Sequence, residues 1–154
     1  GGEPVADLRV RSAPLRGIEV PPELVPLAID EFPALFVAAC CAEGRTVVRG
    51  AEELRVKESD RIAAMAEGLA ALGFATQPTD DGIVIDGRGG DDAVFRAGRG
   101  VAHHDHRIAM SLAIAALRSS GVVEVDDTAN VATSFPGFVA LARGVGLDIE
   151  ERGA

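Results

Sequence analysis

Residues 33–42 read "PALFVAACCA" and residues 108–117 read "IAMSLAIAAL". Each stretch would be apolar on nearly every face of a helix, and neither contains a charged residue. A helix that lacks a polar face has to be surrounded by other elements. In an ordinary α/β domain the sheet is central, and each helix keeps one face in water. The two stretches therefore predict an α/β fold with inverted packing, in which helices lie inside and sheets lie around them.

The chain also contains an internal repeat. The interval from Asp7 to Gly82 equals the interval from Asp30 to Asp105. The aligned segments are "DLRVRS" (7–12) with "GIVIDG" (82–87), "IDEFPALFVAACCAEG" (29–44) with "HDHRIAMSLAIAAL" (104–117), and "ESDRIAAMAEGLAALGF" (58–74) with "VATSFPGFVALARGVGL" (131–147). The repeated unit is a strand, an apolar helix, a strand, a second helix and further strands. We therefore predict a fragment of a larger repeat array, with the tail of one repeat at 1–20, a repeat at 21–95 and a repeat at 96–154.

Turn residues and β-branched runs place the individual elements. The predicted helices are about 31–43, 60–72, 106–119 and 135–144. The predicted strands are 8–10, 18–20, 46–49, 74–76, 83–86, 122–125 and 147–150. Ser59 and Ser134 stand at expected helix N-caps, the latter with Pro136 in the first turn. The glycine-rich "GRGG" (87–90) and "GRG" (98–100) are predicted to be turns, because neither links a strand to a helix as phosphate loops do.

Composition excludes several classes of protein. The chain has 154 residues, of which 47% are hydrophobic, and a formal net charge of −9. That balance provides no general surface for nucleic acid or acidic membranes. No apolar run is long enough to span a bilayer, and the first residues lack the pattern of a signal peptide. Cys40 and Cys41 are adjacent, so we expect free thiols in a reducing compartment, which predicts a cytoplasmic location.

Charged residues gather where helices are predicted to begin. The clusters are Asp30-Glu31, Lys57-Glu58-Ser59-Asp60-Arg61 within "ELRVKESDR" (53–61), Asp105-His106-Arg107, and Thr133-Ser134. Helix N-termini present unpaired amide groups and favour anions. Arg binds carboxylate and phosphate through its two-pronged guanidinium, and Lys acts as a point charge. If these helix starts face one cavity, the cations among them would bind an anionic ligand.

Each cluster also has a simpler structural interpretation. Asp30 and Asp105 would serve as plain helix caps in many proteins. Glu58 would neutralise a neighbouring cation if the cluster were only a solvated helix start. The triplet of His103, His104 and His106 lacks the helical spacing of zinc enzymes, so no metal or other cofactor is predicted.

Four motifs resemble a known family when taken together in chain order. They are "DEFPALFVAACCAEG" (30–44), "EELRVKESDRIAAMAEGLAALG" (52–73), "DHRIAMSLAIAAL" (105–117) and "ATSFPGF" (132–138). They resemble the C-terminal part of the EPSP synthases, the 3-phosphoshikimate 1-carboxyvinyltransferases. The resemblance implies an inside-out α/β barrel, in which each of two domains contains three βαβαββ units with buried helices. This chain would provide about two of those units, as a partial C-terminal domain.

The resemblance implies a reaction and a role for each charged residue. The family transfers the enolpyruvyl group of phosphoenolpyruvate to the 5-hydroxyl of shikimate 3-phosphate in aromatic amino-acid biosynthesis, without a cofactor. Asp30 matches the proton acceptor at the shikimate hydroxyls, and Glu58 matches the glutamate that carries the methyl proton. The matches for ligand binding are Lys57 for shikimate 3-phosphate, with Arg61, Arg107 and His106 for phosphoenolpyruvate. We expect the two carboxylates to have different pKa values and the pocket to be dry and cationic.

One position departs from the family pattern. Many members have a lysine where Thr133 stands, and "VATSFPGF" (131–138) is typical of the subgroup called class II. The resemblance also implies that the N-terminal portion of the enzyme, with its own ligand-binding residues, is a necessary partner. We therefore expect this chain alone to be inactive. Two alternatives stay open, namely a non-catalytic domain that keeps the fold, and the sister family of UDP-N-acetylglucosamine enolpyruvyl transferases.

Overall fold

The computed structural model of the chain describes residues 2, 4–90 and 92–152. The helices are α1 (Phe32–Cys41), α2 (Arg61–Ala71), α3 (His106–Ala115), α4 (Ala129–Ser134) and α5 (Phe138–Gly144). The strands are β1 (Glu43–Val48), β2 (Gln77–Thr79), β3 (Gly82–Arg88), β4 (Gly98–Val101) and β5 (Val123–Asp126). Short 3-10 helices are η1 (Pro22–Leu24), η2 (Pro26–Glu31), η3 (Glu52–Val56) and η4 (Ala116–Arg118).

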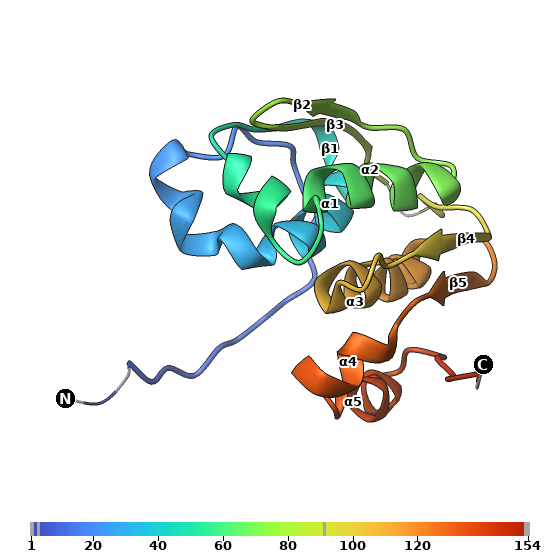
Figure 1. The fold of residues 1–154 in the computed structure, drawn as a ribbon. Helices are drawn as coiled ribbons and strands as arrows, with labels where there is room; N and C mark the ends of the chain where they lie inside the picture. Colours follow the sequence, from blue (N-terminus) through green and yellow to red (C-terminus); the bar gives the residue numbers. More distant parts are fainter. Residues whose placement is uncertain (1, 3, 91, 153–154) are drawn as a thin grey trace.

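Helices α1, α2 and α3 pack against one another, and the sheets lie outside them. An antiparallel sheet in the order β1-β3-β2 covers α1 and α2, and the parallel pair β4-β5 packs on α2 and α3. Figure 1 shows the first sheet above these helices, the β4-β5 pair beside them, and α4 and α5 below α3. This arrangement confirms the predicted inverted packing.

Each apolar helix connects two parallel strand segments. Residues 16 and 19 form parallel bridges with Glu43 and Val47 of β1, and α1 lies between the two segments in the chain. In the same way β4 pairs in parallel with β5, and α3 connects them. Parallel pairing requires a crossover of this kind. The same strand–helix–strand unit thus occurs twice.

The core gathers the aromatic and branched side chains that face the helices. Phe32 and Phe36 of α1 pack ring to ring, and both side chains are at most 1% exposed. Ile85 of β3 and Leu112 of α3 are completely buried in the same cluster. Gly87 lets β3 approach α1, because a Cβ atom there would lie 2.2 Å from the Ala42 carbonyl oxygen. A glycine at this point of the strand therefore sets the distance between sheet and helix.

Within the described residues, other elements cover α1 and α3 on one side and leave part of each helix exposed. Leu35 of α1 is 37% exposed, Ile114 of α3 is 38% exposed, and Leu117 just beyond α3 is 60% exposed. The expectation that both helices are surrounded on every side is therefore not met by the described part of the chain. The uncovered faces are apolar, as the sequence indicated.

Several predicted strands are wrong. Residues 8–10 and 147–150 form no strand, and residues 18–20 take part only in isolated bridges. The strand predicted at 74–76 begins three residues later, at Gln77. Residues 98–100, predicted as a turn, lie in β4, where a Cβ on Gly98 would lie 2.4 Å from the Ala71 carbonyl oxygen. The glycines of this segment allow a strand to pass close to α2, which glycine content alone does not reveal.

Helix boundaries and caps also differ from the prediction. The last predicted helix, 135–144, begins only at Phe138, as α5. Helix α4, which ends at Ser134 just before Pro136, was not predicted. Ser134 is therefore no N-cap. Asp60, and not Ser59, caps α2 by accepting a hydrogen bond from the Ala63 amide at 3.0 Å. Helix α3 ends at 115 and continues as η4, while α1 begins at Phe32 after the 3-10 helix η2, so Asp30 precedes the helix it was expected to cap.

Two further expectations concern the cysteines and the membrane. Cys40 is buried, Cys41 is partly buried, and both are free thiols. Burial raises the pKa of both thiols, so neither is poised to react as a thiolate. Across 2, 4–90 and 92–152, no helix combines the length and the apolar character needed to cross a membrane.

Candidate functional site

The candidate site is centred on Asp30, at the end of η2 and next to α1. Its carboxylate accepts a hydrogen bond from Arg61 Nη1 at 2.9 Å and lies 3.5 Å from Arg107 Nη2. Lys57 Nζ lies 3.8 Å from the same carboxylate. Partial burial raises the pKa of Asp30, but the hydrogen bond from Arg61 and the charges of Arg107 and Lys57 outweigh it and lower the pKa overall. Asp30 is therefore held as a carboxylate.

Arg61, the first residue of α2, binds a different carboxylate with each nitrogen of its guanidinium group. Nε donates to Asp105 Oδ2 at 2.8 Å, Nη1 donates to Asp30, and Nη2 donates to Glu58 Oε2 at 2.6 Å. The Arg61 side chain is only 1% exposed. This buried cation therefore connects three segments that are far apart in the sequence.

Asp105 is the buried counter-ion of Arg61, and its side chain is fully inaccessible to solvent. One oxygen, Oδ1, accepts from the Arg107 amide at 2.9 Å and caps α3. The other, Oδ2, accepts from Arg61 and from the Ser59 hydroxyl at 3.0 Å. The predicted cap is confirmed. The ion pair with Arg61 was missed, because the partner lies 44 residues away and no local pattern marks it.

The remaining partners of the cations are exposed carboxylates. Glu58 on Arg61 is 51% exposed, and Glu53, which accepts a hydrogen bond from Lys57, is 57% exposed. Glu31 lies 3.7 Å from Arg107 and is 74% exposed. The cations of the site are therefore all paired with carboxylates within the described structure, and the expected cationic pocket is not found there. Glu58 pairs with Arg61, as the simpler structural interpretation of the cluster suggested.

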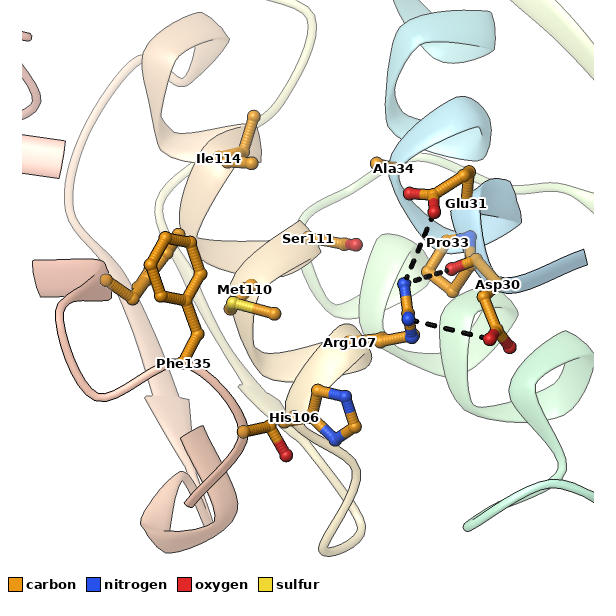
Figure 2. A pocket seen from close by; sticks show the side chains of 12 residues that line it. Asp30, Glu31, Pro33, Ala34, His106, Arg107, Met110, Ser111, Ile114 and Phe135 are labelled. Atoms are coloured by element: carbon orange, nitrogen blue, oxygen red, sulfur yellow. Dashed lines mark hydrogen bonds and ion pairs between the residues drawn. The ribbon is translucent and has the colours of Figure 1, made fainter. Parts of the chain in front are cut away.

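A pocket of about 380 Å³ opens beside these residues. Figure 2 shows Arg107 reaching from α3 toward Asp30 and Glu31, with His106 on the same helix turn. The remaining lining residues are Pro33, Ala34, Met110, Ser111, Ile114, Ser134, Phe135 and Phe138. The pocket thus has a charged end and an apolar end. Lys57, Glu58 and Arg61 do not line it, although all three connect to it through Asp30.

The histidines do not assemble with other ligands. His103 lies 3.1 Å from a carboxylate oxygen of Glu67, and His104 lies 2.7 Å from one of Asp127. Among the residues that the structure describes, no group of three or more His, Cys, Asp or Glu side chains is arranged to hold a metal ion. Only His106 joins the pocket.

Acid should destabilise the fold through Asp105. Desolvation raises its pKa, but the Arg61 and Arg107 contacts lower it below the ordinary value of 3.8. A lowered folded-state pKa stabilises the protein above the unfolded value, and that stabilisation is lost as the pH falls through the folded value. We expect the free energy of unfolding to decline from about pH 4 downward, and less steeply in Asp105→Asn. Denaturant unfolding over this pH range measures both slopes, and equal slopes would contradict the assignment.

Comparison with known proteins places these motifs in context. A family model described as EPSP synthase (3-phosphoshikimate 1-carboxyvinyltransferase) matches residues 1–141. A 3-phosphoshikimate 1-carboxyvinyltransferase from Methylococcus capsulatus is 65% identical over 150 residues, which cover 97% of this chain and 33% of that protein. One from Halorhodospira halophila is 62% identical over 153 residues, covering 99% of this chain and 34% of that protein.

Solved structures that resemble the chain are also EPSP synthases. An EPSP synthase from Acinetobacter baumannii superposes with a TM-score of 0.87 and 58% sequence identity, over 89% of this chain and 32% of that one. A second structure of EPSP synthase from this organism gives a TM-score of 0.86 at 53% identity. The chain spans about a third of the length of the curated relatives it matches.

Proposed function

The chain belongs to the EPSP synthase family, and from this premise we propose that it provides one side of an active site for enolpyruvyl transfer. The substrates are phosphoenolpyruvate and shikimate 3-phosphate. The observation that carries the proposal is the meeting of Lys57, Arg61 and Arg107 at Asp30, with His106 lining the adjoining pocket. Such a group of cations suits ligands that carry phosphate and carboxylate groups.

Asp30 is proposed to act as the general base. It takes the proton of the 5-hydroxyl of shikimate 3-phosphate while that oxygen bonds to C2 of phosphoenolpyruvate. The lowered pKa guarantees the ionised form but makes the carboxylate a weak base. When substrate anions take over the contacts of Arg61, Lys57 and Arg107, less positive charge faces Asp30, so its pKa rises toward the range that proton abstraction needs.

Glu58 is proposed to exchange a proton with the substrate methylene carbon. It gives a proton to that carbon as the tetrahedral ketal forms and takes one back as the double bond is restored. The proton that Asp30 took from the hydroxyl passes to the departing phosphate. Its side chain is 51% exposed and, in the described part of the chain, is held by Arg61. Release of that contact lets Glu58 turn toward a bound ligand. Different surroundings for Asp30 and Glu58 support different roles for the two carboxylates.

The cations are proposed to bind substrate by exchanging partners. Lys57 binds shikimate 3-phosphate after releasing Glu53, while Arg61 and Arg107 bind phosphoenolpyruvate after releasing Glu58 and Glu31. The three carboxylates are exposed and therefore cost little to return to water. His106 completes the wall of the pocket.

The place of the chain in the whole enzyme is also a proposal. We assign residues 1–154 to a partial C-terminal domain, with repeats at 21–95 and 96–154 and the tail of another repeat at 1–20. The two strand–helix–strand units support two repeats, and the second unit lies within 96–154. The strand segment of the first unit, at residues 16 and 19, lies before the assigned start at 21. The N-terminal portion of the enzyme is the proposed partner. The free thiols of Cys40 and Cys41 suit a reducing compartment, and we propose the cytoplasm.

A chimera tests the function directly. In it, residues 1–154 of this chain replace the matching third of the Methylococcus capsulatus relative. We expect phosphate release that depends on both substrates, and growth of a bacterial strain that lacks EPSP synthase on medium without aromatic amino acids. The chimera that folds but releases no phosphate above blank would refute the proposal. A matched reaction with UDP-N-acetylglucosamine in place of shikimate 3-phosphate separates this function from that of the sister transferases.

Removal of the Lys57 counter-ion should improve substrate binding. In Glu53→Gln, Lys57 loses the carboxylate that raises its pKa and occupies its ammonium group. Because an exposed pair is weak, we expect the KM for shikimate 3-phosphate in the chimera to fall only about two- to fivefold. Glu52→Gln removes the same charge one position earlier in η3 and serves as the control. An unchanged KM in Glu53→Gln would argue against exchange at Lys57.

A further inference from the structure

The buried carboxylate of Asp105 has a function in the site that extends beyond capping a helix. We propose that Asp105 is a positioning residue, whose two oxygens fix Arg61 and the start of α3 relative to each other before substrate binds. This inference rests on the proposed function, because it concerns the arginines assigned to phosphoenolpyruvate. Asp105 itself does not line the pocket and touches no substrate in this proposal.

The two oxygens of Asp105 make different contacts. Oδ1 accepts from the backbone amide of Arg107, so it holds the first turn of α3. Oδ2 accepts from the guanidinium of Arg61 and from the hydroxyl of Ser59, so it holds the start of α2. One side chain thus links the two helix ends that carry the phosphoenolpyruvate-binding arginines. A neutral amide has only one oxygen and cannot replace both contacts.

Burial separates Asp105 from the other partners of Arg61. Asp30 and Glu58 are 45% and 51% exposed and can exchange for a ligand, whereas Asp105 is 0% exposed. A charge-assisted hydrogen bond in a dry environment holds its geometry tightly. The Nε side of Arg61 therefore stays fixed while the two Nη atoms change partners. Because Nε is held, the two Nη atoms point toward an incoming carboxylate.

The loop that carries Asp105 is itself held in place. His103 and His104 both adopt positive φ angles, 53° and 58°, which few residues other than glycine adopt readily. Asp127 stabilises this backbone by accepting a hydrogen bond from the His104 amide at 2.6 Å, and the Asp105 amide donates to the Ala102 carbonyl. Asp105 thus projects from a constrained turn, as expected for a residue that sets the position of another.

The test is Asp105→Asn in the chimera. Asparagine is a good N-cap, so α3 keeps its cap while Arg61 loses its fixed partner. We expect the KM for phosphoenolpyruvate to rise about ten- to a hundredfold, with the KM for shikimate 3-phosphate much less affected. A merely structural role would instead lower the active fraction and leave both KM values unchanged. That result would overturn the proposal.

Control variants and a second measurement complete the test. Asp86→Asn breaks the exposed Arg45–Asp86 pair on the outer sheet and should leave both KM values unchanged. Ser59→Ala removes one donor to Oδ2 and should raise the KM for phosphoenolpyruvate a few-fold. If Asp105→Asn does not fold, Ser59→Ala becomes the test of the proposal. An unchanged KM for phosphoenolpyruvate in Ser59→Ala would then count against it.

Nuclear magnetic resonance on the chimera provides a readout that is independent of turnover. The Nε–H signal of Arg61 should exchange slowly with water in the parent and rapidly in Asp105→Asn. A slow signal in both proteins would overturn the proposed contact. An inactive parent chimera in which Arg61 nevertheless shows the protected signal would refute the proposed reaction and leave the contact established.

Discussion

Replacement of Arg61 by methionine is expected to lower the free energy of unfolding of the chain by about 3–5 kcal/mol. Arg61 is 1% exposed and neutralises Asp105, which is 0% exposed. Methionine is unbranched like the stem of arginine, but it is shorter and carries no charge, so the change leaves a buried carboxylate without a cation. Such a group must either remain charged in a dry environment or bind a proton, and both cost free energy. Chemical denaturation of the parent and the variant measures the difference.

A double variant separates the charge effect from loss of packing. Arg61→Met with Asp105→Asn removes both charges and keeps the cap of α3, so it should be more stable than Arg61→Met alone. The control is Arg45→Met, since Arg45 forms an exposed pair with Asp86 and should hardly affect unfolding. A double variant that is as unstable as the sum of the two single variants would show that the buried charge is not the cause.

Replacement of Asp30 by asparagine is expected to reduce kcat of the chimera by about 10²- to 10⁴-fold. The change preserves shape but removes the proposed proton acceptor. It also deprives Arg61, Lys57 and Arg107 of their shared carboxylate. The cations are then freer to bind substrate, so the KM values should stay level or fall while turnover collapses. Steady-state phosphate release at saturating concentrations of both substrates measures the effect.

Two comparisons make that result specific to Asp30. Asp126→Asn removes an equivalent carboxylate from the exposed Arg99–Asp126 pair and should leave turnover unchanged. Raising the pH should not restore Asp30→Asn, because asparagine has no proton-accepting form in this range. Turnover within a few-fold of the parent would remove Asp30 from the role of base.

The arrangement of the helices was predictable because it depends on composition. The apolar runs that became α1 and α3 fixed the inverted packing, and the repeat predicted two equivalent units. The strands were harder to predict from the sequence, because a strand forms only where a partner strand pairs with it. Residues 8–10 have strand composition but no strand partner in the described structure, whereas Gly98 and Gly100 look like a turn and pair with β5.

The site was also predictable only in part. Asp30, Arg61 and Arg107 were expected to share one cavity. Both arginines contact the Asp30 carboxylate, but of the three residues Asp30 and Arg107 line the pocket and Arg61 does not. Helix starts carry a recognisable signal, so the cap at Asp105 was found in the sequence. Its pairing with Arg61 depends on how α2 and α3 pack, and no spacing within either motif encodes that. The roles of these residues in catalysis stay predictions until the variants are measured.

Under the proposed function, the exposed carboxylates paired with Lys57, Arg61 and Arg107 have to be displaced before these cations bind an anionic ligand. A ligand gains only the difference between the contacts it forms and the contacts it displaces. Chloride carries a single charge and cannot accept two parallel hydrogen bonds from a guanidinium group, so it binds more weakly than the glutamate it would replace. A phosphate dianion binds more strongly than that glutamate. The exposed glutamates that pair with these cations would therefore help the site to reject the abundant small anions of the cell.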